Sequence, residues 1–215
     1  MGAVKPVGPV GHATPRSGTG ADLASRLVDE GGRILSADGA SALTLRRLAQ
    51  ASGTSTMAVY TLFGDKQGLL RAMYREGFRR LGTALEEITG RVTDTLTALA
   101  ELGFTYRRTA LANPHLYDLM FGRPVPTFVP DEGTVAVADA AYRPLVKAVQ
   151  CCLDAGQLSG GTAERIALHL WAVSHGMVGL ELAGHLPGDA TEGEAAYAEA
   201  LAFSSAPFRP SLSGR

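Results

Sequence analysis

The sequence predicts an all-α protein of about nine helices, and three observations lead to this fold class. Apolar residues recur at the 3.6-residue spacing of amphipathic helices between residues 21 and 203, and no segment shows the alternation typical of a strand. Ala and Leu dominate the apolar residues whereas Val and Ile are sparse, which favours helices. Gly and Pro stand between the periodic segments, where helices end. A chain of 215 residues buries roughly 70% of its unfolded surface, so it can build a core without disulfides.

Four helices are expected in the N-terminal part, and they cover about residues 21–38, 45–52, 55–62 and 66–88. Gly39 ends the first of them. Thr44 and Ser55 are placed as N-caps of the two short helices, and Gly53 supplies the turn that joins them. The fourth helix is long and connects this part to the rest of the chain.

Five further helices are expected at about residues 93–113, 114–121, 132–155, 162–186 and 192–203. Asn113-Pro114 has the pattern of a cap followed by proline at the first helical position. The segment 122–131 contains three prolines and is predicted to be a loop. Residues 1–18 and 204–215 lack an apolar period and are rich in Gly, Pro or Ser, so we expect disordered tails.

The net charge of −1 is divided unevenly along the chain. Residues 1–80 hold 11 basic and 6 acidic residues, a balance of +5, and the remainder holds 9 basic and 15 acidic residues, a balance of −6. Such asymmetry indicates a module that faces a polyanion, joined to a second module. We therefore expect a domain at 19–65 that faces a polyanion and a second helical domain at 66–203, with 66–88 as the connecting helix.

Cysteine usage and hydropathy exclude several classes of protein. Cys151 and Cys152 are adjacent and are the only cysteines, which fits a reducing compartment. They are expected to be ordinary core or surface residues, with a thiol sensor as the minority alternative. No run of 18 apolar residues occurs and no signal peptide is recognisable, so we expect a cytoplasmic protein with no membrane partner.

The segment 44–63, TLRRLAQASGTSTMAVYTLF, predicts a helix-turn-helix. Ala49 is small where a second helix must cross closely, and Val59 and Phe63 are spaced to pack the second helix onto the first. The second helix would then present its free face to a major groove. The alternative is a helical hairpin whose charges are merely solvated.

The polar residues of this segment divide into two expected roles. Contacts to phosphate position a protein on DNA, and contacts to base edges read the sequence. Positioning is assigned to Thr44, Tyr60 and Lys66, with Ser55 at a helix N-terminus and Arg46 adding positive field. Reading is assigned to Thr56, Met57 and Thr61.

Residues 44–70, TLRRLAQASGTSTMAVYTLFGDKQGLL, resemble the DNA-binding signature of the TetR family of bacterial transcriptional regulators. Matching positions in register are Ala49, Gly53, Ser55, Val59, Tyr60, Phe63, Lys66, Leu69 and Leu70. The resemblance implies that Tyr60 and Lys66 hold phosphates, that the helix from Ser55 reads bases and that the 21–38 helix braces it. Two departures are the polar turn Ser52-Gly53-Thr54 and Thr61, which stands where many members have a basic or aromatic residue.

The C-terminal part resembles a narrower group, the ligand-binding domain named for its Trp-His-Gly motif. Asn113–Phe121 and Trp171–Gly176 carry this likeness. Apolar helices with aromatic and thioether side chains favour a pocket for a small, largely apolar ligand. Candidate lining residues are Phe104, Tyr106, Tyr117, Met120, Phe121, Phe128, Tyr142, Trp171 and His175. Each could equally be ordinary core, His175 could be a satisfied core histidine, and the loop around Phe128 could be a lid or a plain connection.

The last two helices are the expected dimer surface, because in the family such a pair meets its symmetry mate as a four-helix bundle. Candidate interface residues are Ile166, Leu170, Met177, Leu180, Tyr197 and Leu201. The alternative is that both apolar stripes face their own domain.

Catalytic and metal-binding motifs are missing from the sequence, and no cofactor is expected. The function predicted is a homodimeric TetR-type regulator, a repressor released from a palindromic double-stranded DNA operator by a small-molecule effector. The alternatives are a ligand-independent regulator or activator of the same fold, or a small helical enzyme or carrier with an incidental helix-turn-helix.

Overall fold

The computed structural model describes residues 20–186 and 189–210, and within these ranges the chain is helical with no strand. The α-helices are α1 (Gly20–Ala42), α2 (Leu45–Ala51), α3 (Thr56–Phe63), α4 (Lys66–Arg91), α5 (Thr95–Ala112), α6 (Pro114–Tyr117), α7 (Glu132–Asp154), α8 (Ala163–Leu182) and α9 (Ala190–Ser205). A π-helical turn, η1 (Asp118–Gly122), follows α6, and a 3₁₀ turn, η2 (Ala206–Phe208), follows α9. The predicted all-α class is confirmed. The tail predicted at residues 1–18 lies outside the described residues.

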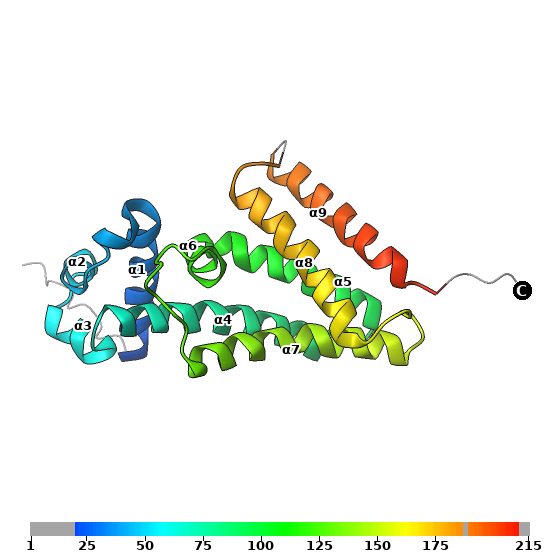
Figure 1. Ribbon diagram of the computed structural model, residues 1–215, viewed down its shortest axis with the longest axis horizontal. Helices are drawn as coiled ribbons and strands as arrows, with labels where there is room; N and C mark the ends of the chain where they lie inside the picture. Colours follow the sequence, from blue (N-terminus) through cyan, green and yellow to red (C-terminus); the bar gives the residue numbers. More distant parts are fainter. Residues whose placement is uncertain (1–19, 187–188, 211–215) are drawn as a thin grey trace, which may run out of the picture.

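The helices form two parts that share α4 (Figure 1). The head, residues 20–65, gathers α1, α2 and α3 at one end of the molecule. The body, residues 66–210, is built along α4 and α7, which lie side by side, and α8 and α9 pair across the other side of the body. No helix of the described ranges is long and apolar enough to cross a membrane.

The short helices of the head begin where the sequence predicts. Thr44 Oγ1 accepts from the Arg47 amide at 3.2 Å and Ser55 Oγ accepts from the Ala58 amide at 3.1 Å, so both are N-caps. Gly39 interrupts α1 with φ of 80°, a conformation that favours glycine, and the helical path predicted to stop there does so.

The structure corrects or refines three local predictions. Asn113 is the N-cap residue of α6 and Pro114 follows it as predicted, but the Asn113 side chain makes no capping hydrogen bond, because its amide donates to the Thr109 carbonyl and its oxygen accepts from Arg80. The tail predicted from residue 204 is ordered up to residue 210: Ser204 is buried, and the Phe208 carbonyl accepts from the Ser159 amide at 2.7 Å. The ninth helix begins at residue 190, because Asp189 and Glu192 form a capping box there.

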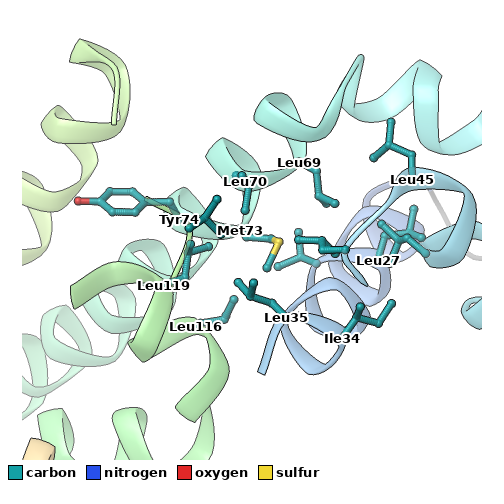
Figure 2. Close-up of a cluster of buried hydrophobic side chains, with 14 of the residues drawn as sticks. Leu27, Ile34, Leu35, Leu45, Leu69, Leu70, Met73, Tyr74, Leu116 and Leu119 are labelled. Carbon is teal, nitrogen blue, oxygen red and sulfur yellow. The ribbon is translucent and has the colours of Figure 1, made fainter. Parts of the chain in front are cut away.

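One continuous hydrophobic cluster joins the head to the start of the body (Figure 2). We call it the joint cluster; its labelled members are Leu27, Ile34, Leu35, Leu45, Leu69, Leu70, Met73, Tyr74, Leu116 and Leu119. Leu69, Leu70 and Met73 of α4 are fully buried in it. The first two turns of α4 therefore belong to the core of the head, although the sequence pattern assigns them to the second domain.

Close helix contact completes the joint. A Cβ atom at Gly32 of α1 would lie 2.0 Å from Cδ2 of His115, so α1 reaches α6 only because residue 32 has no side chain.

A buried ion pair connects two helices of the body: Arg107 of α5, 4% exposed, binds Glu181 of α8 at 2.6 Å.

Candidate functional site

The free face of α3 is formed by side chains that the sequence predicts to contact DNA. Val59 is fully buried against the head, whereas Met57 is 74% exposed and Tyr60 is 51% exposed. Thr61 is also exposed, but its hydroxyl donates to the Met57 carbonyl at 2.9 Å within the helix. Met57 and the Tyr60 hydroxyl are therefore the groups that α3 projects outward with the greatest freedom.

The neighbouring polar groups surround the same face. Thr44, Arg46 and Ser55 are exposed, and Thr56 is half-buried at the first turn of α3. Arg46 takes part in no ion pair within residues 20–186 and 189–210. The N-termini of α2 and α3, each with a hydroxyl cap, lie on the same short unit and offer amide groups to an anion.

Lys66 differs from the mobile charge that the sequence predicts. Its ammonium group is partly buried and donates to the carbonyl of Ala40 near the end of α1. The last carbonyls of a helix have no partner within it, so a lysine at the start of the next helix satisfies one of them. Lys66 therefore fastens α1 to α4 in this structure.

Much of the positive charge of residues 1–80 is already paired. Arg47 binds Asp38 at 2.5 Å, Arg79 binds Glu76 at 2.6 Å, and Arg80 binds both Glu76 and Asp29 at 2.8 Å. These acidic partners are already subtracted in the +5 balance, so the pairing leaves the net charge unchanged. It leaves Arg46 as an arginine of the head that can face a polyanion without first breaking an ion pair of the described residues.

The body encloses a cavity of about 490 Å³ between α4, α5, η1, α7, α8 and α9. This volume falls in the range of small-molecule sites. Six of the nine predicted pocket residues line it: Phe104, Tyr106, Met120, Phe121, Tyr142 and Trp171. The sequence analysis missed the α4 wall, Tyr74, Phe78, Leu81 and Leu85, because their helical spacing is also the pattern of plain core packing.

The other three predicted pocket residues do not line the cavity. Phe128 packs against Tyr74 in the joint cluster, with ring centroids 5.7 Å apart, so its loop is a packed connection rather than a lid. Tyr117 and His175 lie behind the wall, where the Tyr117 hydroxyl is 2.7 Å and the Tyr106 hydroxyl is 3.0 Å from His175 Nδ1. Burial lowers the pKa of His175, which favours the neutral ring, and Nδ1 lies within hydrogen-bond distance of both tyrosine hydroxyls.

Most of the predicted dimer residues face their own protomer. Ile166, Leu170 and Tyr197 are buried, Met177 is half-buried in the core, and Leu201 lines the cavity. Only Leu180 is exposed, at 45%. The apolar stripe chosen from the sequence is the inner face of α8, because α8 is apolar on more than one side.

Comparison with protein families covers both parts of this structure. A model described as "Bacterial regulatory proteins, tetR family" matches residues 27–73, and one described as "Tetracyclin repressor-like, C-terminal domain" matches residues 99–203. The chain carries both domains of a TetR-family regulator. Both models describe domains of bacterial regulators rather than of enzymes.

Solved structures of TetR-family regulators share the fold. A protein of unknown function from Rhodococcus sp. RHA1 is 29% identical, with a TM-score of 0.76 over 92% of this chain and 100% of that one. The TetR-family regulator PfmR from Thermus thermophilus is 19% identical, with a TM-score of 0.69 over 84% of this chain and 97% of its own. A TetR-family regulator from Marinobacter aquaeolei is 19% identical, with a TM-score of 0.67 over 85% and 95%. No match was found among curated protein sequences.

Proposed function

We propose that the protein is a homodimeric transcriptional repressor that holds a palindromic operator through α3 and leaves it when a small, largely apolar molecule fills the cavity. The observation that carries the proposal is the position of α4. Leu69, Leu70 and Met73 bury α4 in the joint cluster with the head, while Phe78, Leu81 and Leu85 of the same helix line the cavity. A ligand that favours a different placement of α4 shifts the head with it, and this difference in affinity between two states releases the DNA.

In the proposed complex, α3 of each protomer enters a major groove. Two-fold symmetry places the half-sites about 34–36 Å apart, or a multiple of that. The exposure of Met57 supports a base-edge contact, and the exposure of Tyr60 and Arg46 supports phosphate contacts. Lys66 contributes to DNA binding by holding α1 on α4 and reaches a phosphate only if it releases Ala40.

DNA binding is tested with the segment upstream of the protein's own gene and a scrambled segment, titrated at several salt concentrations. Arg46→Ala is expected to lower the slope of log affinity against log salt by about one phosphate contact for each protomer. Tyr60→Phe should weaken binding to both DNAs without changing the slope, and Met57→Ala should weaken binding to the operator alone. Tyr142→Phe, which removes a hydroxyl from the body, is the matched control. If all three head variants bind as the wild type does, the assignment of α3 is wrong.

The dimer is proposed to form through the outer ridge of α8, together with α9. Leu168, Ala172, Gly176 and Leu180 follow one another at four-residue intervals and all four are exposed. A Cβ atom at Gly176 would meet nothing within 4 Å, so a second helix has room to approach closely. Phe203 of α9, 70% exposed, adds apolar surface. This ridge replaces the inner stripe that the sequence suggests.

Light scattering on Leu168→Glu tests the ridge, because a charge desolvated in the interface weakens association. We expect the dimer dissociation constant to rise at least about tenfold, the effect of roughly 1.4 kcal/mol. Val135→Glu on α7, where the wild-type side chain is 45% exposed, is the matched control and should leave the dimer intact. A Leu168→Glu protein that dimerises as well as the wild type places the interface elsewhere.

The sign of regulation is tested by transcription from the operator in a defined reaction. A repressor lowers the transcript, and the ligand restores it. An activator raises the transcript instead, and a ligand-independent regulator gives one level whether or not the cavity is filled. The Trp-His-Gly subtype of the body stays a proposal as well, supported by the ring contact of Trp171 and His175, whose centroids are 6.0 Å apart.

A further inference from the structure

Two groups of apolar side chains, aromatic residues and leucines, make up much of the cavity lining. Five of its lining aromatic residues form a chain of ring contacts: Tyr74–Phe78 at 4.9 Å, Phe78–Phe121 at 5.5 Å, Phe121–Trp171 at 6.2 Å and Trp171–Tyr142 at 5.5 Å between centroids. We call this chain the aromatic arc. Leucines line the remaining wall, contributed by α4, α5, α7, α8, α9 and the segment before α8: Leu81, Leu85, Leu96, Leu99, Leu102, Leu145, Leu158, Leu170 and Leu201.

A single acidic residue, Asp139, lies among the described residues that line the cavity. It is one helical turn before Tyr142 on α7 and is exposed, which places it at the rim next to the arc. Its negative charge contributes to the raised pKa of Tyr74, after burial, so the carboxylate lies near a second ring of the arc. Within the described ranges, Asp139 takes part in no ion pair.

The one basic residue among the described residues of the lining, Arg209, lies too far away to neutralise Asp139. Arg209 follows Phe208, whose carbonyl is bonded to Ser159 just beyond the end of α7. Helix α7 ends at Asp154, which is 15 residues after Asp139. Asp139 therefore lies about 20 Å from that end along the helix axis. The carboxylate of Glu164 is close enough to Tyr142 to contribute to the raised pKa of that phenol, again after burial. The carboxylates of Asp139 and Glu164 therefore both lie near rings of the aromatic arc.

Aromatic faces and an unpaired carboxylate attract the same chemical class of ligand. The face of each ring carries partial negative charge and binds organic cations, with indole the strongest. Rings and leucines accept the apolar body of such a molecule without leaving a buried polar group unsatisfied.

We propose that the cavity binds a lipophilic organic cation, with its ammonium group between Asp139 and the aromatic arc and its apolar body along the leucine wall. This inference names the ligand class for the proposed function and rests on it. A free carboxylate, which would seek Arg209 instead, is the competing ligand.

The test uses three probes with the same ten-carbon chain: decyltrimethylammonium, decanoate and decanol, each below its micelle concentration. The chain contains one tryptophan, Trp171, and it lines the cavity, so quenching of its emission reports occupancy directly. The cation should bind at least about tenfold tighter than either other probe. Asp139→Asn should weaken the cation about tenfold and leave decanol unchanged. Asp154→Asn, an exposed acid on the same helix outside the cavity, should change neither.

Three outcomes overturn the inference: equal binding of the three probes, binding of none, or preference for decanoate that is lost in Arg209→Gln. Release of operator DNA is measured in parallel, so the two proposals fail separately. If the cation quenches Trp171 through Asp139 but leaves the DNA bound, the ligand class stands and the proposed release does not. If decanoate binds and releases the DNA, the proposed function stands and the ligand class is wrong.

Discussion

The joint cluster and the cavity-bearing part of the body are made from the same types of residue and pack in opposite ways. In the joint, small residues let backbones approach: Gly32 touches His115, and a Cβ atom at Gly31 would lie 3.1 Å from Sδ of Met73. In the body, large aromatic and leucine side chains surround about 490 Å³ of space. A filled region moves as one piece, whereas a hollow one can change shape at small cost. We therefore expect the cavity-bearing part of the body to deform more easily than the joint cluster, with α4 connecting the two.

Truncation should separate the two regions most clearly. Leu116→Ala removes a side chain that is 1% exposed in the joint and is expected to cost about 2–5 kcal/mol of unfolding free energy. Leu145→Ala removes a leucine of the cavity wall, which already lacks neighbours on one side, and should cost roughly half as much or less. Urea unfolding of both variants measures the difference. Equal losses would mean that the chamber collapses around the truncated wall and is no softer than the joint.

Adding a side-chain atom to the joint should lower the free energy of unfolding nearly as much as removing side-chain atoms does. Gly32→Ala forces a Cβ atom onto the His115 ring and is expected to cost about 1–3 kcal/mol. In Gly90→Ala, where a Cβ atom meets nothing within 4 Å, the better helix former should instead add up to about 1 kcal/mol. Thermal unfolding compares the pair. A harmless Gly32→Ala would show that α1 can shift on α6, contrary to a rigid joint.

The exposed first turn of α3 should be less sensitive than the joint cluster. Ser55→Ala removes the hydroxyl that caps α3 and is expected to cost about 1 kcal/mol. Ser36→Ala, at an exposed position inside α1, should stay within about 0.5 kcal/mol of the wild type. Hydrogen exchange of the α3 amides gives the local measurement. Unchanged exchange in Ser55→Ala would mean that tertiary contacts alone set the start of α3.

Acidification should have the smallest effect on the free energy of unfolding. It acts through His175, which lies behind the cavity wall. Burial lowers the pKa of His175 below its ordinary value of 6.5, so on acidification the unfolded chain takes up a proton before the folded one does. Stability contributed by the neutral ring is complete above pH 6.5 and is lost as the pH falls below it. Denaturation curves between pH 7.5 and about pH 5.5 should therefore flatten in His175→Gln. A wild-type slope in His175→Gln would contradict this assignment.

Helices α3 and α8 show how far the sequence predicts the molecule. In α3, Ser55 and Gly64 mark the ends and Val59 stands out as the buried residue, so its boundaries and free face follow from local rules. In α8, Ile166 and Leu170 face inward while Leu168 and Leu180 face outward, and all are leucine or isoleucine. Hydrophobic periodicity cannot choose between two apolar faces, because the choice depends on which neighbours cover them.

The candidate sites divide in the same way. Exposure of Met57 and Tyr60 follows from the helix-turn-helix spacing, and six pocket residues follow from the sequence because aromatic side chains collect in the body. Two sets of hydrogen bonds could not be predicted: Lys66 donates to the Ala40 carbonyl, and His175 pairs with the hydroxyls of Tyr106 and Tyr117. Each joins residues that are far apart in the chain. No local pattern encodes such partners.

The hollow chamber also bears on how such a regulator changes over generations. A substitution at Leu145 or Tyr142 alters the shape or polarity of the proposed ligand site at a small cost to the fold, whereas a change at Leu116 endangers both. Inherited variation can therefore accumulate on the chamber walls while the joint stays fixed. A lineage built on this architecture can acquire a response to a new compound without rebuilding the part that holds DNA.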